Sequence, residues 1–320
     1  MKNLIHQQKV IFESSESMVR YALTIISRTN ALDETAISQV ERLLDEGYPE
    51  YEKKKLSQRA IDYIMDPKNP EQFNSETKSK LNPNELGCDL FFQVQSIRRT
   101  KKLFVFDMDS TLIYQEVIEL IAAYANIENQ VAVITEKAMN GEIDFNESLI
   151  ERVALLKGID SSSIWDELKV KIRITKGARE LCRALKRLNV ITAVCSGGFI
   201  PLADHIKKEL GLDYAFANQL GVDSNNILDG TTVGPIVNGD KKAELLQKIA
   251  KDHSIDLSDS VAVGDGANDL KMMLIAGYGI AWNAKPKVQQ LAPSCLNSNT
   301  LRDILYVMGF SDAEIIELCK

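Results

Sequence analysis

The sequence predicts an α/β fold, in which a Rossmann-like parallel sheet carries an inserted helical cap and follows a small α+β module at the N-terminus. From residue 101 to about residue 287, short apolar runs alternate with helix-length segments, the pattern of a parallel sheet covered by helices. The first two predicted strands are separated by far more residues than a crossover helix needs. Residues 1–100 lack this alternation, which indicates a separate unit.

The core sheet is predicted from four apolar runs of strand length, at residues 103–106, 190–195, 261–263 and 279–281. A loop rich in Gly, Ser or Asp follows each of the first three runs, and a helix-length segment follows each loop. In open α/β sheets, ligands bind beyond the carboxyl ends of the strands. We therefore expect the three loops to converge on one crevice.

Two insertions interrupt this core. Between the first two strands, amphipathic helices are expected at residues 116–124, 131–140, 145–157 and 163–172. The economical interpretation is a helical cap over the crevice, at about residues 116–175. A second segment, residues 217–240, alternates apolar and polar residues and is predicted as a β-hairpin or a short β excursion.

The front of the chain is predicted as a small α+β module. A chain of 320 residues exceeds the usual size of one compact unit, so we expect domains at residues 1–100 and 101–320. Within the module, strands are expected at residues 9–12 and 88–94, and helices at residues 17–27 and 35–44. A polar stretch that contains prolines covers residues 66–85.

Composition excludes several classes of function. The net charge of −7 argues against nucleic acids and anionic membranes as partners, because both require a basic surface. No apolar run approaches the ~20 residues that cross a bilayer, and the N-terminus does not have the pattern of a secretory signal. We therefore expect a cytoplasmic protein, and an anionic substrate would need a local positive pocket or a metal ion.

Cysteine and histidine chemistry is also disfavoured. The five cysteines include no CxxC pair, and Cys182 and Cys195 lie in apolar runs, which predicts reduced packing residues. The three histidines show no metal-ligand spacing. A zinc site or a serine–histidine triad is therefore not expected.

Two carboxylates, Asp107 and Asp109, stand one residue apart at the tip of the first predicted strand, in the stretch FVFDMDSTL. Such a pair is unfavourable unless a cation or a shared proton relieves the repulsion. Magnesium prefers oxygen ligands, so the pair could hold this ion or could divide nucleophilic and acid–base roles. A lone Asp-x-Asp also caps helices, so the motif by itself leaves a structural role open.

The next two strand ends carry further candidates. Ser196 and Gly197 follow the second strand, where a hydroxyl and a backbone amide could approach an anion, although a simple turn explains the glycine as well. The stretch GDGAND, which contains Asp265 and Asp269, follows the third strand and also has the chemistry of a turn and helix cap. Lys242 begins a helix between them, and would offer the crevice a cation unless it is a solvated surface lysine.

Taken together, these four signals resemble the four motifs of the haloacid dehalogenase-like phosphohydrolases. The likeness extends to the phosphoserine phosphatase family, above all to its eukaryotic, yeast-like members. It includes the stretches MNGEIDF at residues 139–145 and IAWNAKP at residues 280–286, and it covers about residues 101–310. The resemblance implies Mg²⁺-dependent hydrolysis of O-phospho-L-serine to L-serine and phosphate, the last step of serine biosynthesis.

The resemblance also implies roles for the strand-end residues. Asp107 would be the nucleophile that forms an aspartyl-phosphate. Asp109 would protonate the leaving serine oxygen and then deprotonate the attacking water. Mg²⁺ would be held by the side chains of Asp107 and Asp265 and by the main-chain carbonyl of Asp109. Asp269 and Asn268 would support these ligands.

Substrate contacts follow from the same resemblance. Ser196, the Gly197 amide, Lys242 and Asn268 would bind the phosphoryl group. Arg152 would pair with the substrate carboxylate and Glu116 with its ammonium. Met139 and Phe145 would line the lid and exclude water, although both residue types also suit a plain cap core.

Two departures and two alternatives remain. The first hundred residues match no motif, although many relatives carry a regulatory, ferredoxin-like domain there. Lys176 stands where related enzymes often have proline, close to a hinge of the cap. The alternatives are a phosphotransferase to a small alcohol such as homoserine, which would use the same catalytic residues, and a catalytically silent serine sensor or interaction protein.

Overall fold

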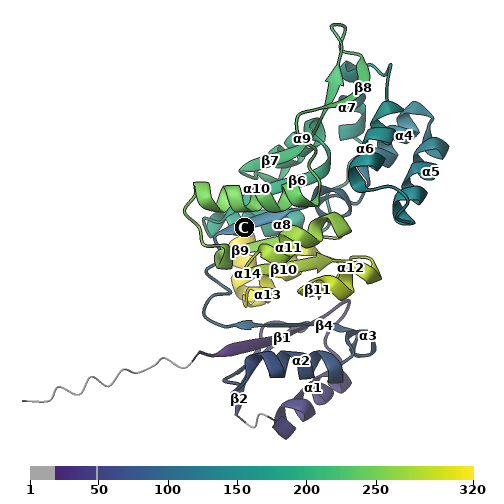
Figure 1. Cartoon of the computed structure of the whole chain (residues 1–320). Coiled ribbons are helices and arrows are strands. Elements are labelled where there is room, and N and C mark those ends of the chain that lie inside the picture. The colour runs from purple at the N-terminus through teal and green to yellow at the C-terminus, as the bar shows by residue number, and fades with distance from the viewer. Residues whose placement is uncertain (1–18, 48–49) are drawn as a thin grey trace, which may run out of the picture.

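The computed structural model describes residues 19–47 and 50–320, apart from the side chain of Met139. The strand predicted at residues 9–12 lies outside this part. The described chain forms a four-stranded and a seven-stranded sheet, and its helical cap and front module lie at opposite ends of the molecule (Figure 1). This arrangement confirms the predicted fold class.

The larger sheet has the strand order β11-β10-β9-β5-β6-β7-β8, and its neighbours are parallel except for the antiparallel pair β7–β8. Its strands are β5 (Leu103–Phe106), β6 (Ile191–Phe199), β7 (Tyr214–Val222), β8 (Leu228–Val233), β9 (Ser260–Gly264), β10 (Tyr278–Trp282) and β11 (Ser294–Leu296). The predicted strands are thus confirmed, and β7 with β8 forms the predicted hairpin.

The central strands are apolar on both faces because helices cover the sheet on both sides. Leu103 and Val105 of β5 pack with the helices α10, α11 and α12. Phe104 and Phe106, which point the other way, pack with α8, α9, α13 and α14. These helices are α8 (Ala178–Arg187), α9 (Ile200–Leu210), α10 (Gly239–Asp252), α11 (Leu270–Ile275), α12 (Pro286–Leu291), α13 (Ile304–Val307) and α14 (Asp312–Cys319).

The register of the sheet brings three strand ends into line. Phe106, the last residue of β5, is paired with Val194 of β6 and with Val263 of β9. The residues that follow in each strand therefore leave the sheet at the same edge. One detail differs from the prediction, because β6 continues through Ser196 to Phe199 while its register with β7 shifts after Cys195.

The cap consists of four helices between β5 and α8, at the predicted positions. They are α4 (Val117–Ala125), α5 (Glu128–Met139), α6 (Phe145–Ala154) and α7 (Ser161–Lys169). A bridge between Ile113 and Ile174 brings the outgoing and returning connections of the cap side by side. Among the described helices, none combines the length and apolarity that crossing a bilayer would require.

The front module contains an antiparallel sheet of order β2-β3-β1-β4. Its elements are β1 (Tyr21–Ser27), α1 (Glu34–Gly47), β2 (Tyr51–Lys55), β3 (Ala60–Met65), α2 (Pro70–Lys80), α3 (Pro83–Leu86) and β4 (Cys88–Val94). The helix predicted at residues 17–27 is wrong, because residues 21–27 form β1. Residues 22–26 are buried at consecutive positions, so both faces of this segment are covered, as in a central strand and not in an amphipathic helix.

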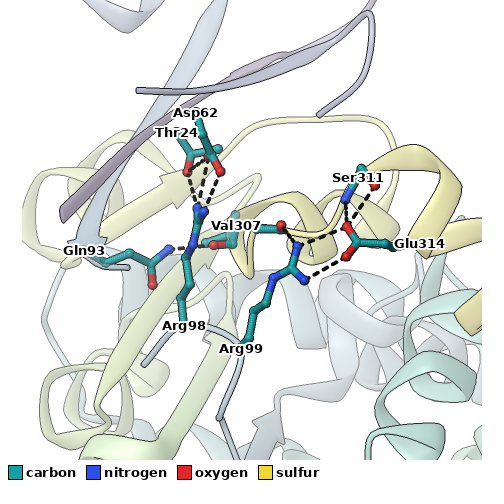
Figure 2. Close-up of polar contacts among 9 residues, drawn as sticks. Thr24, Asp62, Gln93, Arg98, Arg99, Val307, Ser311 and Glu314 are labelled. Carbon is teal, nitrogen blue, oxygen red and sulfur yellow. Dashed lines mark hydrogen bonds and ion pairs between the residues drawn. The ribbon is translucent and has the colours of Figure 1, made fainter. Parts of the chain in front are cut away.

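Polar contacts at and after the end of β4 brace the module and join it to the larger unit (Figure 2). The Arg98 guanidinium, in the connection after β4, donates to both carboxylate oxygens of Asp62 and to Thr24 Oγ1, with a shortest distance to Asp62 of 2.5 Å. Gln93 Nε2 donates to the Val307 carbonyl at 2.6 Å. Arg98 and Asp62 are only 3% and 0% exposed, so this ion pair is inaccessible to water.

We predict that Asp62→Asn lowers the free energy of unfolding by about 3 kcal/mol, because the charge of Arg98 stays buried without its counter-charge. Chemical denaturation measures the change. The control is Glu52→Gln, which breaks an exposed ion pair with Arg20 and should cost less than about 1 kcal/mol. Equal small losses in both variants would contradict the structural role of the buried pair.

Candidate active site

Asp107 and Asp109 lie at the tip of β5, where the chain bends sharply. The Asp107 amide donates to the Val263 carbonyl at 2.8 Å, which extends the pairing of β5 with β9 by one residue. Ser110 then adopts a left-handed backbone conformation with φ 54°, which is unusual for a residue with a side chain. This bend turns the main chain back from the sheet edge and leaves both carboxyl groups in the crevice.

The side chain of Lys242, in the first turn of α10, extends to Asp107 at the end of β5. Its Nζ donates to Asp107 Oδ1 and to Asp269 Oδ1, the latter at 2.6 Å, and its side chain is 0% exposed. Burial opposes the charge of Lys242, but the two carboxylates outweigh this effect, so its pKa is raised and it stays protonated. The alternative of a solvated surface lysine is therefore wrong.

Three carboxylates form a cluster that could hold a metal ion. Oxygen atoms of Asp107, Asp265 and Asp269 lie within 4.8 Å of one another. Asp265 accepts a long hydrogen bond from Thr111 Oγ1 at 3.5 Å. Burial, and then the charges of Asp269 and Glu116, raise the pKa of Asp265 to about 7.

This donor set fits a hard divalent cation such as Mg²⁺. All its members are oxygen ligands, and one lysine leaves the cluster with an excess of negative charge. Burial, and next the charge of Asp269, also raise the pKa of Asp107 well above its usual range, although Lys242 acts against this. A cation here would stabilise the ionised carboxylates. It would therefore relieve the repulsion between Asp107 and Asp109 that the sequence predicts.

Asp109 has an environment of its own. Its Oδ1 accepts a hydrogen bond from the Val117 amide at 2.7 Å, and its Oδ2 accepts one from Ser196 Oγ at 3.0 Å. Burial, followed by the charge of Glu116, raises the pKa of Asp109 to about 7, although both hydrogen bonds lower it. A carboxyl group with such a pKa can both give and take a proton near neutral pH.

The end of β6 forms an irregular turn beside Asp109. The Gly198 amide donates to Ser196 Oγ at 2.8 Å, and the Asn218 side chain donates to the Gly197 carbonyl at 2.8 Å. Asn218 in turn accepts from the Val237 amide at 2.8 Å. These bonds hold the irregular end of β6 in a fixed shape.

The cap reaches this turn through Phe145, the first residue of α6. A Cβ atom at Gly197 would lie 2.9 Å from Phe145 Cζ and 3.6 Å from Asn268 Nδ2, so there is no room for any side chain at this position. The Asp144–Glu147 capping box fixes the start of α6 and therefore the position of the ring. Phe145, Gly197 and Asn268 thus lie close to one another.

The two predicted specificity residues lie within electrostatic reach of Asp109. Glu116 is exposed and accepts from Ser110 Oγ at 2.6 Å. Arg152 donates from Nε to the Ser148 carbonyl at 3.0 Å. Burial lowers the pKa of Arg152, while the charges of Glu116 and Asp109 act in the opposite direction, which places all three groups within electrostatic reach of one another.

The remaining candidate and the missed residues can now be placed. Met139 ends α5, but its side chain lies outside the described part of the structure. The sequence reasoning missed Thr111, beside Asp265, and Asn218, which braces Gly197. Thr111 stands two residues after Asp109 in the sequence, and that proximity was an available signal. Asn218 has no local signal, because its role arises only when β7 packs beside β6.

The chain resembles known proteins over most of its length. The family model described as haloacid dehalogenase-like hydrolase matches residues 101–277. The phosphoserine phosphatase of Saccharomyces cerevisiae is 47% identical over 306 residues, which are 93% of this chain and 99% of that protein.

Solved structures show the same relationship. A haloacid dehalogenase family hydrolase from Salmonella enterica serovar Typhi has a TM-score of 0.77 at 27% identity and covers 90% of this chain and 98% of its own. A structure described as a phospho-aspartyl intermediate analogue of phosphoserine phosphatase is 44% identical, with a TM-score of 0.60, and covers 64% of this chain and 98% of its own.

We predict that, in the metal-free protein, the contribution of Asp265 to the free energy of unfolding falls as the pH rises. The folded pKa is about 7, whereas an unfolded aspartate titrates near 4, so between these values only the folded state holds this proton. The contribution is therefore most favourable below about pH 4, falls through the window up to about pH 7, and is constant above it.

The measurement is chemical denaturation of wild type and Asp265→Asn in EDTA over this pH range. The stability of wild type relative to the variant should fall by up to on the order of 3 kcal/mol as the pH rises. Saturating Mg²⁺ should reduce this fall, because the ion favours the deprotonated carboxylate. Parallel pH profiles in EDTA would mean that Asp265 is not perturbed in the fold.

Proposed function

The chain belongs to the phosphoserine phosphatase family within the haloacid dehalogenase-like hydrolases, and from that premise we propose that it hydrolyses O-phospho-L-serine to L-serine and phosphate. The observation that carries the proposal is the pairing of two differently perturbed carboxyl groups at one strand tip. Asp107 touches Lys242, whereas Asp109 touches Ser196 and has a pKa of about 7. This division suits a nucleophile beside an acid–base group.

In the first half-reaction, a carboxylate oxygen of Asp107 attacks phosphorus. The new bond joins this oxygen to phosphorus, and the bond between phosphorus and the serine oxygen breaks. Asp109 gives its proton to the leaving oxygen, so serine departs neutral at that atom. The product on the protein is an aspartyl-phosphate.

In the second half-reaction, water attacks the phosphorus of the aspartyl-phosphate. Asp109, now ionised, takes a proton from this water, and the bond between phosphorus and the Asp107 oxygen breaks. Phosphate leaves and both carboxyl groups return to their starting states. A pKa of about 7 suits Asp109 to both proton transfers, because neither direction is strongly uphill near neutral pH.

Charge stabilisation is assigned to the groups around the two aspartates. Lys242, Ser196 and the Gly197 amide would bind the phosphoryl oxygens, and Asn268 lies beside them. Asp107, Asp265, Asp269 and the Asp109 carbonyl would hold Mg²⁺, which when bound neutralises charge on the cluster and on the phosphate. Lys242 already supplies one buried cation that needs no reorganisation.

Substrate selection is assigned to the cap. Arg152 offers a planar guanidinium to the serine carboxylate, and Glu116 offers a carboxylate to the serine ammonium. Phe145 lies over Gly197, where it would keep water from the transferring group. Met139, at the end of α5, is proposed to complete the lid.

The wider setting is part of the same proposal. The enzyme would act in the cytoplasm at the last step of serine biosynthesis, with residues 1–100 as a regulatory, ferredoxin-like domain and residues 101–320 as the catalytic domain. The strand order β2-β3-β1-β4 and the two helices packed on this sheet support the ferredoxin-like description of the described part of the module.

We predict that the purified protein releases phosphate from O-phospho-L-serine in the presence of Mg²⁺ and without any added alcohol. A phosphate-release assay measures the rate, with and without homoserine and with EDTA in place of Mg²⁺. If release required homoserine, the protein would be a phosphotransferase. If no phosphate ester were cleaved, the silent sensor would be the better description.

Asp107→Asn is the matched control for this assay. It removes the nucleophile while Lys242 keeps its contact with Asp269 at 2.6 Å, so the variant should fold and lose activity. Circular dichroism verifies the fold. Near-normal activity in this variant would rule out the covalent route.

We also predict that Arg152→Ala raises KM for phosphoserine about 10- to 100-fold, the equivalent of one charge-assisted contact. KM for a phosphate ester without a carboxylate should change much less. The control is Lys137→Ala, which removes an exposed cap cation that pairs loosely with Glu151 at 3.9 Å. Equal losses of Arg152→Ala on both substrates would remove Arg152 from the specificity pocket.

A further inference from the structure

A polar cleft lies between the front module and the catalytic unit, and the proposed phosphatase mechanism makes no use of it. Its volume is about 240 Å³. The module contributes Thr29 and Arg59, and the catalytic unit contributes Lys176, Glu180, Thr300 and Arg302. The cleft therefore joins two parts of the chain that are far apart in sequence.

Positive charge is in excess at this cleft, although the whole chain has a net charge of −7. The Arg59 guanidinium is balanced by Asp303, which it contacts at 2.6 Å. Lys176 and Arg302 have no such ion pair among the described residues, and Glu180 is the one carboxylate in the lining. With Glu180 set against Lys176 and Arg302, the lining keeps one net positive charge that an anion would meet.

Unused hydrogen-bond donors point to the same ligand chemistry. Arg59 Nε and Arg302 Nε are both buried, and neither has a partner among the described residues. A buried donor without a partner costs about 1–3 kcal/mol. Arg59 lines the cleft from the module and Arg302 lines it from the catalytic unit, so both of these unpartnered donors belong to residues of its walls.

The walls of the cleft are held in place before any ligand arrives. Arg59 Nη2 donates to the Ser27 carbonyl at 2.8 Å, which fixes the arginine on the module. On the other side, the Leu301 amide donates to the Lys176 carbonyl at 2.9 Å. Gly177 has φ +84°, and a Cβ there would lie 2.1 Å from Thr300 Oγ1, so the two segments are in tight contact.

We propose that this cleft binds a small oxyanion, a molecule with a carboxylate or phosphate group that pairs with the guanidinium and ammonium groups of Arg302 and Lys176. The planar fork of arginine matches both oxyanions, and the polar lining and small volume disfavour an apolar or bulky ligand. Lys176 and Gly177 end the segment that returns from the cap to α8, so the bound anion connects the module to a hinge of the cap.

Binding is best measured by isothermal titration calorimetry in EDTA, with inorganic phosphate and malonate as separate probes. Binding at the active site does not confuse the result, because substitutions of Arg302 and Lys176, which line the cleft, leave the active-site residues unchanged. The measurement also needs no turnover. Its failure would leave the proposed phosphatase function untouched.

We expect wild type to bind at least one probe, and Arg302→Gln to weaken this binding at least 10-fold. Lys176→Gln, at an exposed position, tests the same site if Arg302→Gln proves unstable. The control Arg42→Gln removes an exposed arginine of α1 that does not line the cleft, and should bind as wild type does.

The pattern of binding identifies the oxyanion. Preference for phosphate or for malonate would distinguish a phosphorylated ligand from a carboxylate ligand, and either supports the site. Absence of binding to wild type would overturn the proposal. Binding that is unchanged in both Arg302→Gln and Lys176→Gln would overturn it as well.

Discussion

The active site depends on one buried lysine shared between two carboxylates. Lys242 contacts Asp107 and Asp269 where water cannot reach, and Asp265 adds a third carboxylate to the same cluster. Burial of so many like charges is costly unless cations compensate for them. The lysine compensates for part of this charge. The negative charge that remains favours binding of a divalent ion and of a positively polarised phosphorus. Burial, and then the charge of Asp269, raises the pKa of Asp107 and of Asp265.

The sheet register makes that cluster possible. Phe106 is level with Val194 and Val263, so Asp107, Ser196 and Asp265 all emerge at one edge of the sheet. Gly264 lets Asp269 approach, since a Cβ at this position would lie 2.4 Å from Asp269 Cγ. A slip of one strand by a residue would reverse its side chains and separate the carboxylates. The register that packs the core therefore also fixes the positions of the catalytic residues.

Most of the fold and of the candidate site can be predicted from the sequence, but only where the signals are local. Apolar runs such as residues 103–106 followed by polar loops predict the sheet edge, because both signals are local. The helix predicted at residues 17–27 fails because burial on both faces depends on the neighbouring strands β3 and β4. The same applies to Asn218, which braces Gly197 only through tertiary contact, and to Lys242, whose burial no helical pattern reveals. Features that depend on contacts between residues far apart in sequence cannot be predicted from local patterns.

The module is joined to the catalytic unit in a way that restricts how it could act. Ile26, Ala60 and Phe91, from the sheet face opposite α1 and α2, belong to the same apolar cluster as Met308 and Phe310 of the catalytic unit. The Arg98–Asp62 ion pair lies at this junction (Figure 2). Because a continuous core resists sliding, the module cannot swing freely about its connection. Any influence on catalysis must then pass through segments at the boundary of the two units, and Lys176, in the connection from the cap to α8, lines the cleft between them.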